Sequence, residues 1–219
     1  MNTASIVNMP KSPYQHIAYF LHRLHRLKNY IRFSEANWED KLASYNQSLA
    51  NDELNVKSFG GRRDHWADLA NEFPQYHRKA SFLMIFAMLE DDLTQFCKAI
   101  AAEQKLTATV FDTAGRGIER AKAYLTKTAS FPFPAATAEW QKIKIYADVR
   151  NALIHAAGYL EPGNSQHERV KKAAKAPDSG LLLHHHARSQ IGLELGFLPS
   201  VIETLERFYE SLLSATKKP

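Results

Sequence analysis

Residues 76–103 read YHRKASFLMIFAMLEDDLTQFCKAIAAE and carry the strongest helical pattern of the chain. Apolar side chains recur every three or four residues in this stretch, at Phe82, Ile85, Leu89, Leu93, Phe96 and Ile100. Because an α-helix has 3.6 residues per turn, this spacing places them in one stripe. Leu83, Phe86 and Ala87 form a second stripe. The sequence therefore predicts a long helix that is covered on two sides, as in the centre of a helical bundle.

The segments on either side of this helix predict an all-α bundle with one small β-hairpin. Helices are expected over 14–32, 38–50, 64 onward with a break or a new start at Pro74, 116–129, 137–157, 167–175 and from Pro199 to the end. Gly158 is a natural residue to end the helix over 137–157. Residues 181–186 and 189–194 are short enough for two strands, so the hairpin is expected before the last helix.

The length of 219 residues suits one large helical domain, and a composition of 45% hydrophobic residues suits a buried core. We expect a flexible N-terminal tail over 1–13 and a single domain over 14–219. The helices within 14–73 are interpreted as a family-specific extension of that domain.

The cysteine content favours a reducing, cytoplasmic compartment, and the charge is compatible with an anionic partner such as RNA. The net charge is +5, and residues 11–34 contain five Lys or Arg and no acid. Such a strip is either a solvated helix face or a surface that tracks phosphates. The single cysteine, Cys97, excludes an internal disulfide and is expected to pack as a small buried residue. The most apolar run, residues 80–89, is too short to cross a bilayer, so no membrane partner is expected.

The candidate site lies in residues 147–160, which read ADVRNALIHAAGYL. Arg150 and Asn151 are adjacent near the end of a predicted helix, and His155 follows one turn later. Asn151 and His155 stand at i and i+4, so their side chains can meet. Arg150 points about 140° away from His155 on an ideal helix. A two-fold pairing of two such helices would bring both residue types into one shared cleft.

The same helix predicts a second packing partner. It has two apolar faces, one with Tyr146, Val149 and Leu153 and the other with Trp140, Ile143, Ala147 and Ile154. A narrow polar stripe lies beside the second face and holds Lys144, Asp148, Asn151 and His155. One face fits the bundle core; the other fits an additional helix or a second copy of the chain.

The motif Arg150-Asn151-x-x-x-His155 resembles the RNxxxH form of the Rx4–6H signature of HEPN domains. These all-α domains usually dimerise and often act as metal-independent endoribonucleases in toxin–antitoxin, abortive-infection and CRISPR systems. The resemblance extends over roughly 76–213 and includes a long apolar helix that carries acids at 90–92. It implies a homodimer, RNA as substrate, and a cognate antitoxin or defence partner.

The resemblance also implies roles for individual residues. The ribose 2′-OH would attack the adjacent phosphorus and leave a 2′,3′-cyclic phosphate. His155 would transfer the proton, since histidine side chains titrate near neutral pH, and Arg150 would hold the phosphate oxygens. Asn151 would orient His155 or donate to the phosphate. Glu90 and Asp148 are expected to support the site, with Glu90 fixing Arg150, and no metal or other cofactor is expected.

Two alternatives remain open from the residues alone. The first is a non-catalytic HEPN-type module that binds RNA, nucleotide or protein, in which Arg150 pairs with a core acid and His155 caps its helix. The second is a metal site at His184 and His186, which share one side of a strand but lack further ligands at a recognisable spacing. Ala157 stands where HEPN toxins that are modified by a nucleotidyltransferase carry a tyrosine, so we do not expect such a partner.

Overall fold

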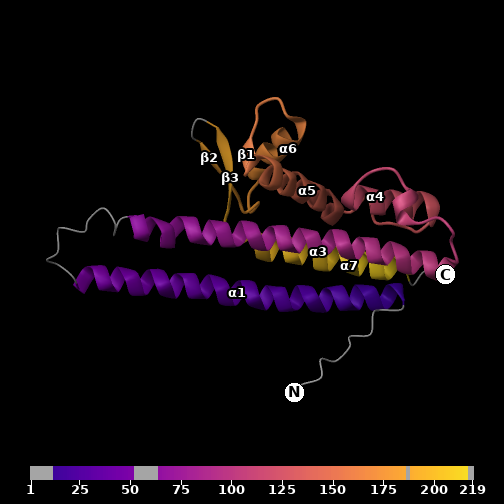
Figure 1. Ribbon diagram of the computed structural model, residues 1–219, viewed down its shortest axis with the longest axis horizontal. Coiled ribbons are helices and arrows are strands. Elements are labelled where there is room, and N and C mark those ends of the chain that lie inside the picture. Colours follow the sequence, from indigo (N-terminus) through magenta and orange to yellow (C-terminus); the bar gives the residue numbers. More distant parts are fainter. Residues whose placement is uncertain (1–11, 52–63, 186–187, 217–219) are drawn as a thin grey trace, which may run out of the picture. The chain divides into compact units, whose positions relative to one another are not determined.

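The computed structural model describes residues 12–51, 64–185 and 188–216 and is mostly helical with one small sheet (Figure 1). The helices are α1 (Pro13–Asn51), the π-helical turn η2 (Asp68–Glu72), α3 (Phe73–Gln104), the 3-10 turn η3 (Val110–Asp112), α4 (Gly117–Ala123), the π-helical turn η4 (Tyr124–Thr128), α5 (Ala138–Ala156), α6 (Ser165–Ala174) and α7 (Phe197–Thr216). The strands are β1 (Tyr159–Leu160), β2 (Leu181–His185) and β3 (Ser189–Leu193). None of the described helices is both long and apolar enough to span a membrane. Residues 1–11 of the predicted tail lie outside the described residues.

The first helix corrects a sequence-based expectation. Two helices were predicted over 14–32 and 38–50, but α1 continues without interruption from Pro13 to Asn51. The polar residues between the predicted helices include neither Gly nor Pro, so nothing in the backbone chemistry stops the helix there. Glu35, in that polar stretch, is buried and accepts two hydrogen bonds from Arg78 of α3, at 2.7 and 2.8 Å. The polar residue at this place thus belongs to a packed helix.

Helical structure resumes at Asp64, as predicted, and passes through Pro74 without a break. Proline lacks an N–H and crowds the carbonyl of the preceding turn, which normally interrupts a helix. Here the preceding turn is the wide π-helical η2, in which the N–H of Phe73 donates to the carbonyl of Asp68. Such wide turns relieve local crowding in a helix. The expected break or new start at Pro74 is therefore absent, since helical structure runs without interruption from Asp64 to Gln104.

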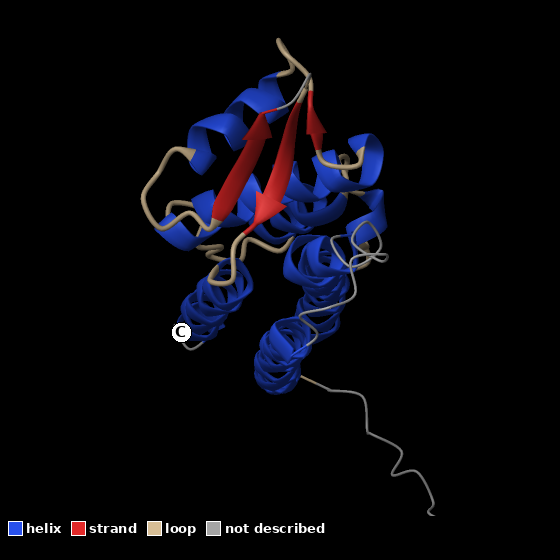
Figure 2. Cartoon of the chain, turned by 90° about the vertical axis from the view of Figure 1, so that its left-hand side faces the viewer, coloured by secondary structure: helices blue, strands red, loops and turns tan. Residues whose placement is uncertain are grey.

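The hairpin and the later helices were predicted within a few residues, but the sheet has one strand more than expected. β2 and β3 pair antiparallel with His184 opposite Gln190, which confirms the hairpin. β1 adds to the other side of β3, with Tyr159 opposite Gln190, so that β3 is the central strand (Figure 2). Because β1 has only two residues, its sequence carries no alternation that could have predicted it.

The described residues divide into two compact units. The first unit comprises those of Met1–His25, Ala87–Gln141 and Thr204–Pro219, and the second comprises those of Arg26–Phe86 and Lys142–Glu203. The expectation that 14–219 form one domain stays a prediction. The candidate motif and the whole sheet belong to the second unit.

Aromatic packing forms the core of the first unit. Trp140 is fully buried, and its ring centroid lies 4.7 Å from that of Phe133 and 5.5 Å from that of Phe208. Cys97 is buried as well, with its sulfur 3.7 Å from the carbonyl oxygen of Ala121, and burial raises the pKa of its thiol to about 12. Cys97 is therefore a packed small residue, as the sequence predicted.

A buried carboxyl in the first unit makes stability depend on pH. Burial raises the pKa of Asp92 to about 7, while Tyr209 and Arg23 act in the opposite direction. Asp92 Oδ2 and the Tyr209 hydroxyl lie buried without a completed hydrogen bond among the described residues. Because the unfolded chain ionises at its ordinary value near 4 and the folded chain only near 7, Asp92 lowers stability as pH rises through that window.

We therefore expect Asp92→Asn to equal the wild type in stability below about pH 4 and to exceed it increasingly up to about pH 7. Above that pH the advantage should stay constant, since the carboxyl is then ionised in both states. Urea unfolding at several pH values and constant ionic strength measures this difference. An advantage that does not change with pH would contradict the assignment.

The second unit is built around a cluster of three aromatic rings. Phe82 of α3 is fully buried, and its ring centroid lies 6.3 Å from Tyr146 of α5 and 5.3 Å from Phe197 of α7. The side-chain amide of Gln75 exchanges two hydrogen bonds with the backbone of Leu193, at 2.8 and 2.9 Å, which attaches β3 to α3. These contacts hold α5 and the sheet against α3 within the unit.

The predicted second stripe of α3 is only partly covered. Phe86 is buried, but Leu83 is half-buried and Ala87 is exposed. Met84, on the same side, keeps 56% of its surface exposed. The expectation of a helix covered on both sides therefore holds for Phe86, while Met84 and Ala87 leave the second side partly open in the single chain.

Candidate functional site at the end of α5

The end of α5 is defined by a backbone turn into the sheet. The N–H of Gly158 donates to the carbonyl of Ala152 at 2.9 Å, and the carbonyl of Gly158 accepts from the N–H of Ile191 at 2.9 Å. Ala157 and Gly158 have φ values of 49° and 82°, a left-handed turn that glycine adopts without strain. The predicted stop at Gly158 is confirmed. It places His155 in the last turn of α5, directly before β1.

The motif residues lie on the exposed side of this last part of α5. Val149 is fully buried, whereas Arg150 and Asn151 are half-buried and His155 is exposed. Ile154 has 48% of its surface exposed. With about 100° per residue, Ile154 lies between Arg150 on one side and Asn151 and His155 on the other. An apolar side chain thus stands in the middle of the polar motif.

The second predicted apolar face of α5 is buried over most of its length. Trp140 and Ile143 of the second face are fully buried, and Ala147 is half-buried. Only the end of that face, at Ile154, remains exposed in the single chain. The need for an additional partner is therefore confined to the turns that carry the motif.

The structure brings Arg150 and Asn151 into direct contact. Nη1 of Arg150 donates to Oδ1 of Asn151 at 3.1 Å. The amide nitrogen of Asn151 is therefore at the opposite end of the amide from Arg150. No hydrogen bond joins the described side chains of Asn151 and His155, although their spacing permits one. The guanidinium and the imidazole of one chain flank Ile154 and do not converge on one point.

Asp148, expected to support the site, has a specific partner. Its buried carboxylate accepts two hydrogen bonds from Arg169 of α6, from Nε at 2.7 Å and from Nη2 at 2.9 Å. This contact raises the pKa of Arg169 above its already high ordinary value. The bidentate geometry is the strongest form of a carboxylate–guanidinium pair. Asp148 thus joins α6 to the polar stripe of α5.

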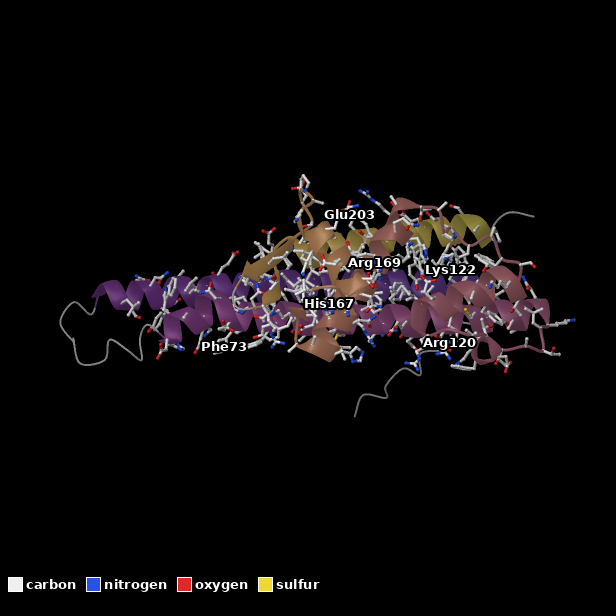
Figure 3. All side chains as sticks on the ribbon, turned by 90° about the horizontal axis from the view of Figure 1, so that it is seen from above. Phe73, Arg120, Lys122, His167, Arg169 and Glu203 are labelled. Atoms are coloured by element: carbon white, nitrogen blue, oxygen red, sulfur yellow. The ribbon has the colours of Figure 1, made fainter. Side chains whose placement is uncertain are left out.

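Local contacts fix the position of α6 and hence of Arg169 (Figure 3). The side chain of Asn164 caps the helix by accepting from the N–H groups of Gln166 and His167, at 2.9 and 3.2 Å. His167 is buried, and its Nδ1 accepts from the N–H of Glu161 at 2.7 Å. Sequence reasoning recognised a short basic helix here but did not connect Arg169 with the motif. The sequence offered only an indirect signal, an acid at Asp148 beside an apolar face of the helix, without indicating which basic residue pairs with it.

Two further candidates, Glu90 and His184, have surroundings of their own. Glu90 belongs to the first unit, where its carboxylate packs against Gly117 at the start of α4. Its expected contact with Arg150 stays a prediction. His184 is exposed on β2, where its ring lies over Gly192, and His186 lies outside the described residues. Among the described residues, no three His, Cys, Asp or Glu side chains form a group that could hold a metal ion.

The groups at this end of α5 are suited to an anionic ligand. Asn151 and His155 lie on one polar stripe with Asp148, whose partner Arg169 stands beside it, and Arg150 reaches Asn151 from the other side of Ile154. Comparison of the chain with protein-family models, curated proteins and solved structures finds no match. What the chain does is therefore inferred from its own residues.

Proposed function

We propose that the chain is a HEPN-type endoribonuclease that cleaves RNA without a metal ion, in a toxin or phage-defence context. The observation that supports this most is the exposure of His155 beside the hydrogen-bonded pair of Arg150 and Asn151. Asp148, the buried acid on the polar stripe, pairs with Arg169 and places a second guanidinium beside the stripe.

The proposed reaction is an internal transfer at phosphorus. The 2′-oxygen of a ribose forms a bond to the adjacent phosphorus as its proton passes to an imidazole. The bond from phosphorus to the 5′-oxygen of the next nucleotide breaks, and that oxygen takes up a proton. The products are a 2′,3′-cyclic phosphate and a 5′-hydroxyl. Arg150 stabilises the negative charge that develops on the phosphate oxygens, and Asn151 holds the guanidinium in place.

A homodimer completes the proposed site. One imidazole removes a proton while a second group donates one, and two copies of His155 can divide these tasks. Within one chain Arg150 and His155 lie on opposite sides of Ile154, so a facing α5 would supply the missing partner. The exposed Ile154 provides apolar contact area for this pairing.

Ile154→Asp is accordingly expected to convert the dimer into a monomer, because it puts a charge at the centre of an apolar contact. Sedimentation velocity at micromolar protein concentration measures the change. Phe33→Asp is the matched control, since Phe33 is also an exposed apolar residue, on α1, and should leave the dimer intact. A dimer whose subunit contacts lie more than about 15 Å from His155 would refute the composite site.

Metal independence is the sharpest test of the chemistry. RNA cleavage by the purified protein should continue in EDTA and leave cyclic-phosphate ends, because the proposed mechanism uses only side chains and the ribose itself. End-group analysis by mass spectrometry identifies these products. Activity that disappears with EDTA and returns with a divalent ion would indicate a metal nuclease and redirect attention to His184.

A growth assay relates the activity to the cell. Expression of the wild-type chain is expected to arrest growth, and His155→Ala is expected to relieve the arrest. A cognate antitoxin would relieve it as well. If neither the wild type nor the variant cleaves RNA and both bind the same RNA, nucleotide or protein equally well, the chain is a non-catalytic module.

A further inference from the structure

Arg169 presents a guanidinium that is held on one edge and exposed on the other. A guanidinium carries five N–H donors, and Asp148 engages only the edge formed by Nε and Nη2. The side chain of Arg169 is 50% exposed, while that of Asp148 is only 7% exposed. The buried carboxylate of Asp148 thus holds the guanidinium on its inner edge, and the N–H groups of the outer edge are exposed to solvent. Figure 3 shows Arg169 on α6.

The place of this guanidinium is set by its anchor. Asp148, Asn151 and His155 follow one another at intervals of three and four residues, so they occupy one side of α5. Seven residues separate Asp148 from His155, which corresponds to two helical turns or about 10 Å along the axis. Arg169 therefore stands on the same polar stripe as Asn151 and His155, although it comes from a different helix.

We propose that Arg169 is a substrate-binding residue that contacts an RNA phosphate next to the one being cleaved. This inference rests on the proposed ribonuclease function. An RNA strand whose scissile phosphate lies at His155 carries further phosphates along its length. A strand that follows the polar stripe would bring one of these phosphates to Arg169. A guanidinium that is already oriented loses less conformational freedom when it binds a phosphate.

The basic surface continues along α6 beyond Arg169. Lys172 is exposed one turn further along the helix and faces the same side. Asp148 cancels the positive charge of Arg169 in this ion pair. It also fixes the direction of the guanidinium N–H groups that it does not bind. Arg169 thus contributes directional hydrogen bonds, and Lys172 contributes charge.

A merely structural role would also place Arg169 here, because a buried Asp148 needs a partner. Arg169→Gln alone would leave that carboxylate uncompensated and could unfold the protein. The double variant Asp148→Asn/Arg169→Gln removes both charges together and keeps an amide pair in their place. It is therefore the variant with which binding is measured, after circular dichroism has shown a helical content equal to the wild type.

The probe is a fluorescein-labelled single-stranded RNA with 2′-O-methyl groups throughout, which cannot be cleaved. Fluorescence anisotropy of the full chain should give a Kd for the double variant about tenfold higher than for the wild type at about 100 mM salt. The slope of log K against log salt should fall by about 0.7, the value for one phosphate contact on a single strand. With cleavable RNA, KM should rise by a similar factor while kcat changes less than about threefold.

Arg188→Gln is the matched control. Arg188 also pairs with a carboxylate, that of Glu161 at 3.0 Å, but both side chains are exposed and neither stands on the motif stripe. Its Kd and salt slope should equal those of the wild type. A folded double variant that binds with the wild-type Kd and slope overturns the role of Arg169 and leaves the ribonuclease proposal standing. If the double variant does not fold, Arg169 and Asp148 are needed for the fold, and the proposed binding role of Arg169 is overturned as well. A wild type that does not bind the RNA overturns both proposals.

Discussion

Replacing His155 with alanine is expected to lower the rate of RNA cleavage by at least about a hundredfold, because the imidazole that transfers the proton is lost. His155 is exposed in the last turn of α5, so the substitution should leave the fold intact. Single-turnover cleavage of a labelled RNA under saturating protein measures the chemical step. RNA affinity should fall much less than the rate, since phosphate contacts are spread over many Lys and Arg.

Arg150→Ala is expected to reduce cleavage by a similar factor for a different reason. The guanidinium would no longer hold the phosphate oxygens as negative charge develops on them. Asn151 would also lose the donor that now fixes its amide, at 3.1 Å. Because the proposed mechanism assigns transition-state charge to Arg150 and proton transfer to His155, rate profiles against pH should differ between the two variants.

His184→Ala provides the matched control for His155→Ala. His184 is likewise an exposed histidine of the second unit, but it lies on β2 and takes no part in the proposed site. It should cleave RNA at the wild-type rate. If purified His155→Ala cleaves as fast as wild type, the ribonuclease proposal is wrong at its central residue. If that variant unfolds instead, His155 is structural and the motif match is a coincidence of spacing.

Phe82→Ala should lower the free energy of unfolding by about 3–5 kcal/mol, the range for a large aromatic removed from a packed core. Phe82 is fully buried and contacts the rings of Tyr146 and Phe197. The cavity would lie directly under α5, one turn before Arg150. We therefore expect slower RNA cleavage in this variant even at temperatures where it remains folded. Urea unfolding followed by circular dichroism measures the loss.

Phe33→Ala is the control for this stability measurement. Phe33 is the same residue type on α1, but 72% of its surface is exposed. Its removal should change the free energy of unfolding by less than about 0.5 kcal/mol, as is usual for surface positions. A loss of under about 1 kcal/mol for Phe82→Ala would mean that the three-ring cluster does not carry the core of the second unit.

The candidate site could be predicted from the sequence only in part. The adjacent Arg150 and Asn151 and the later His155 were recognisable, because their spacing on one helix is a local property. The exposure of His155 and the half-buried positions of Arg150 and Asn151 were not, since they depend on which face of α5 the aromatic cluster covers. The missing residue is Arg169, whose partner Asp148 lies 21 positions earlier in the chain. No local pattern connects two residues at such a separation.

The sequence by itself determined the helices and where most of them stop. The periodic apolar residues of α3 and α7 and the glycine after α5 act within a few residues of one another, so their effect can be deduced without a fold. Only the tertiary structure decided that α1 continues through Glu35, that β1 joins the sheet, and that Arg169 reaches the motif stripe. In each case the deciding contact is made with a distant segment: Arg78 for Glu35, β3 for β1, and Asp148 for Arg169. A buried charge or an unpaired backbone group costs free energy, so each of these buried groups needs a polar partner. Burial itself arises only when the chain has folded, and the sequence therefore does not show which partner is needed.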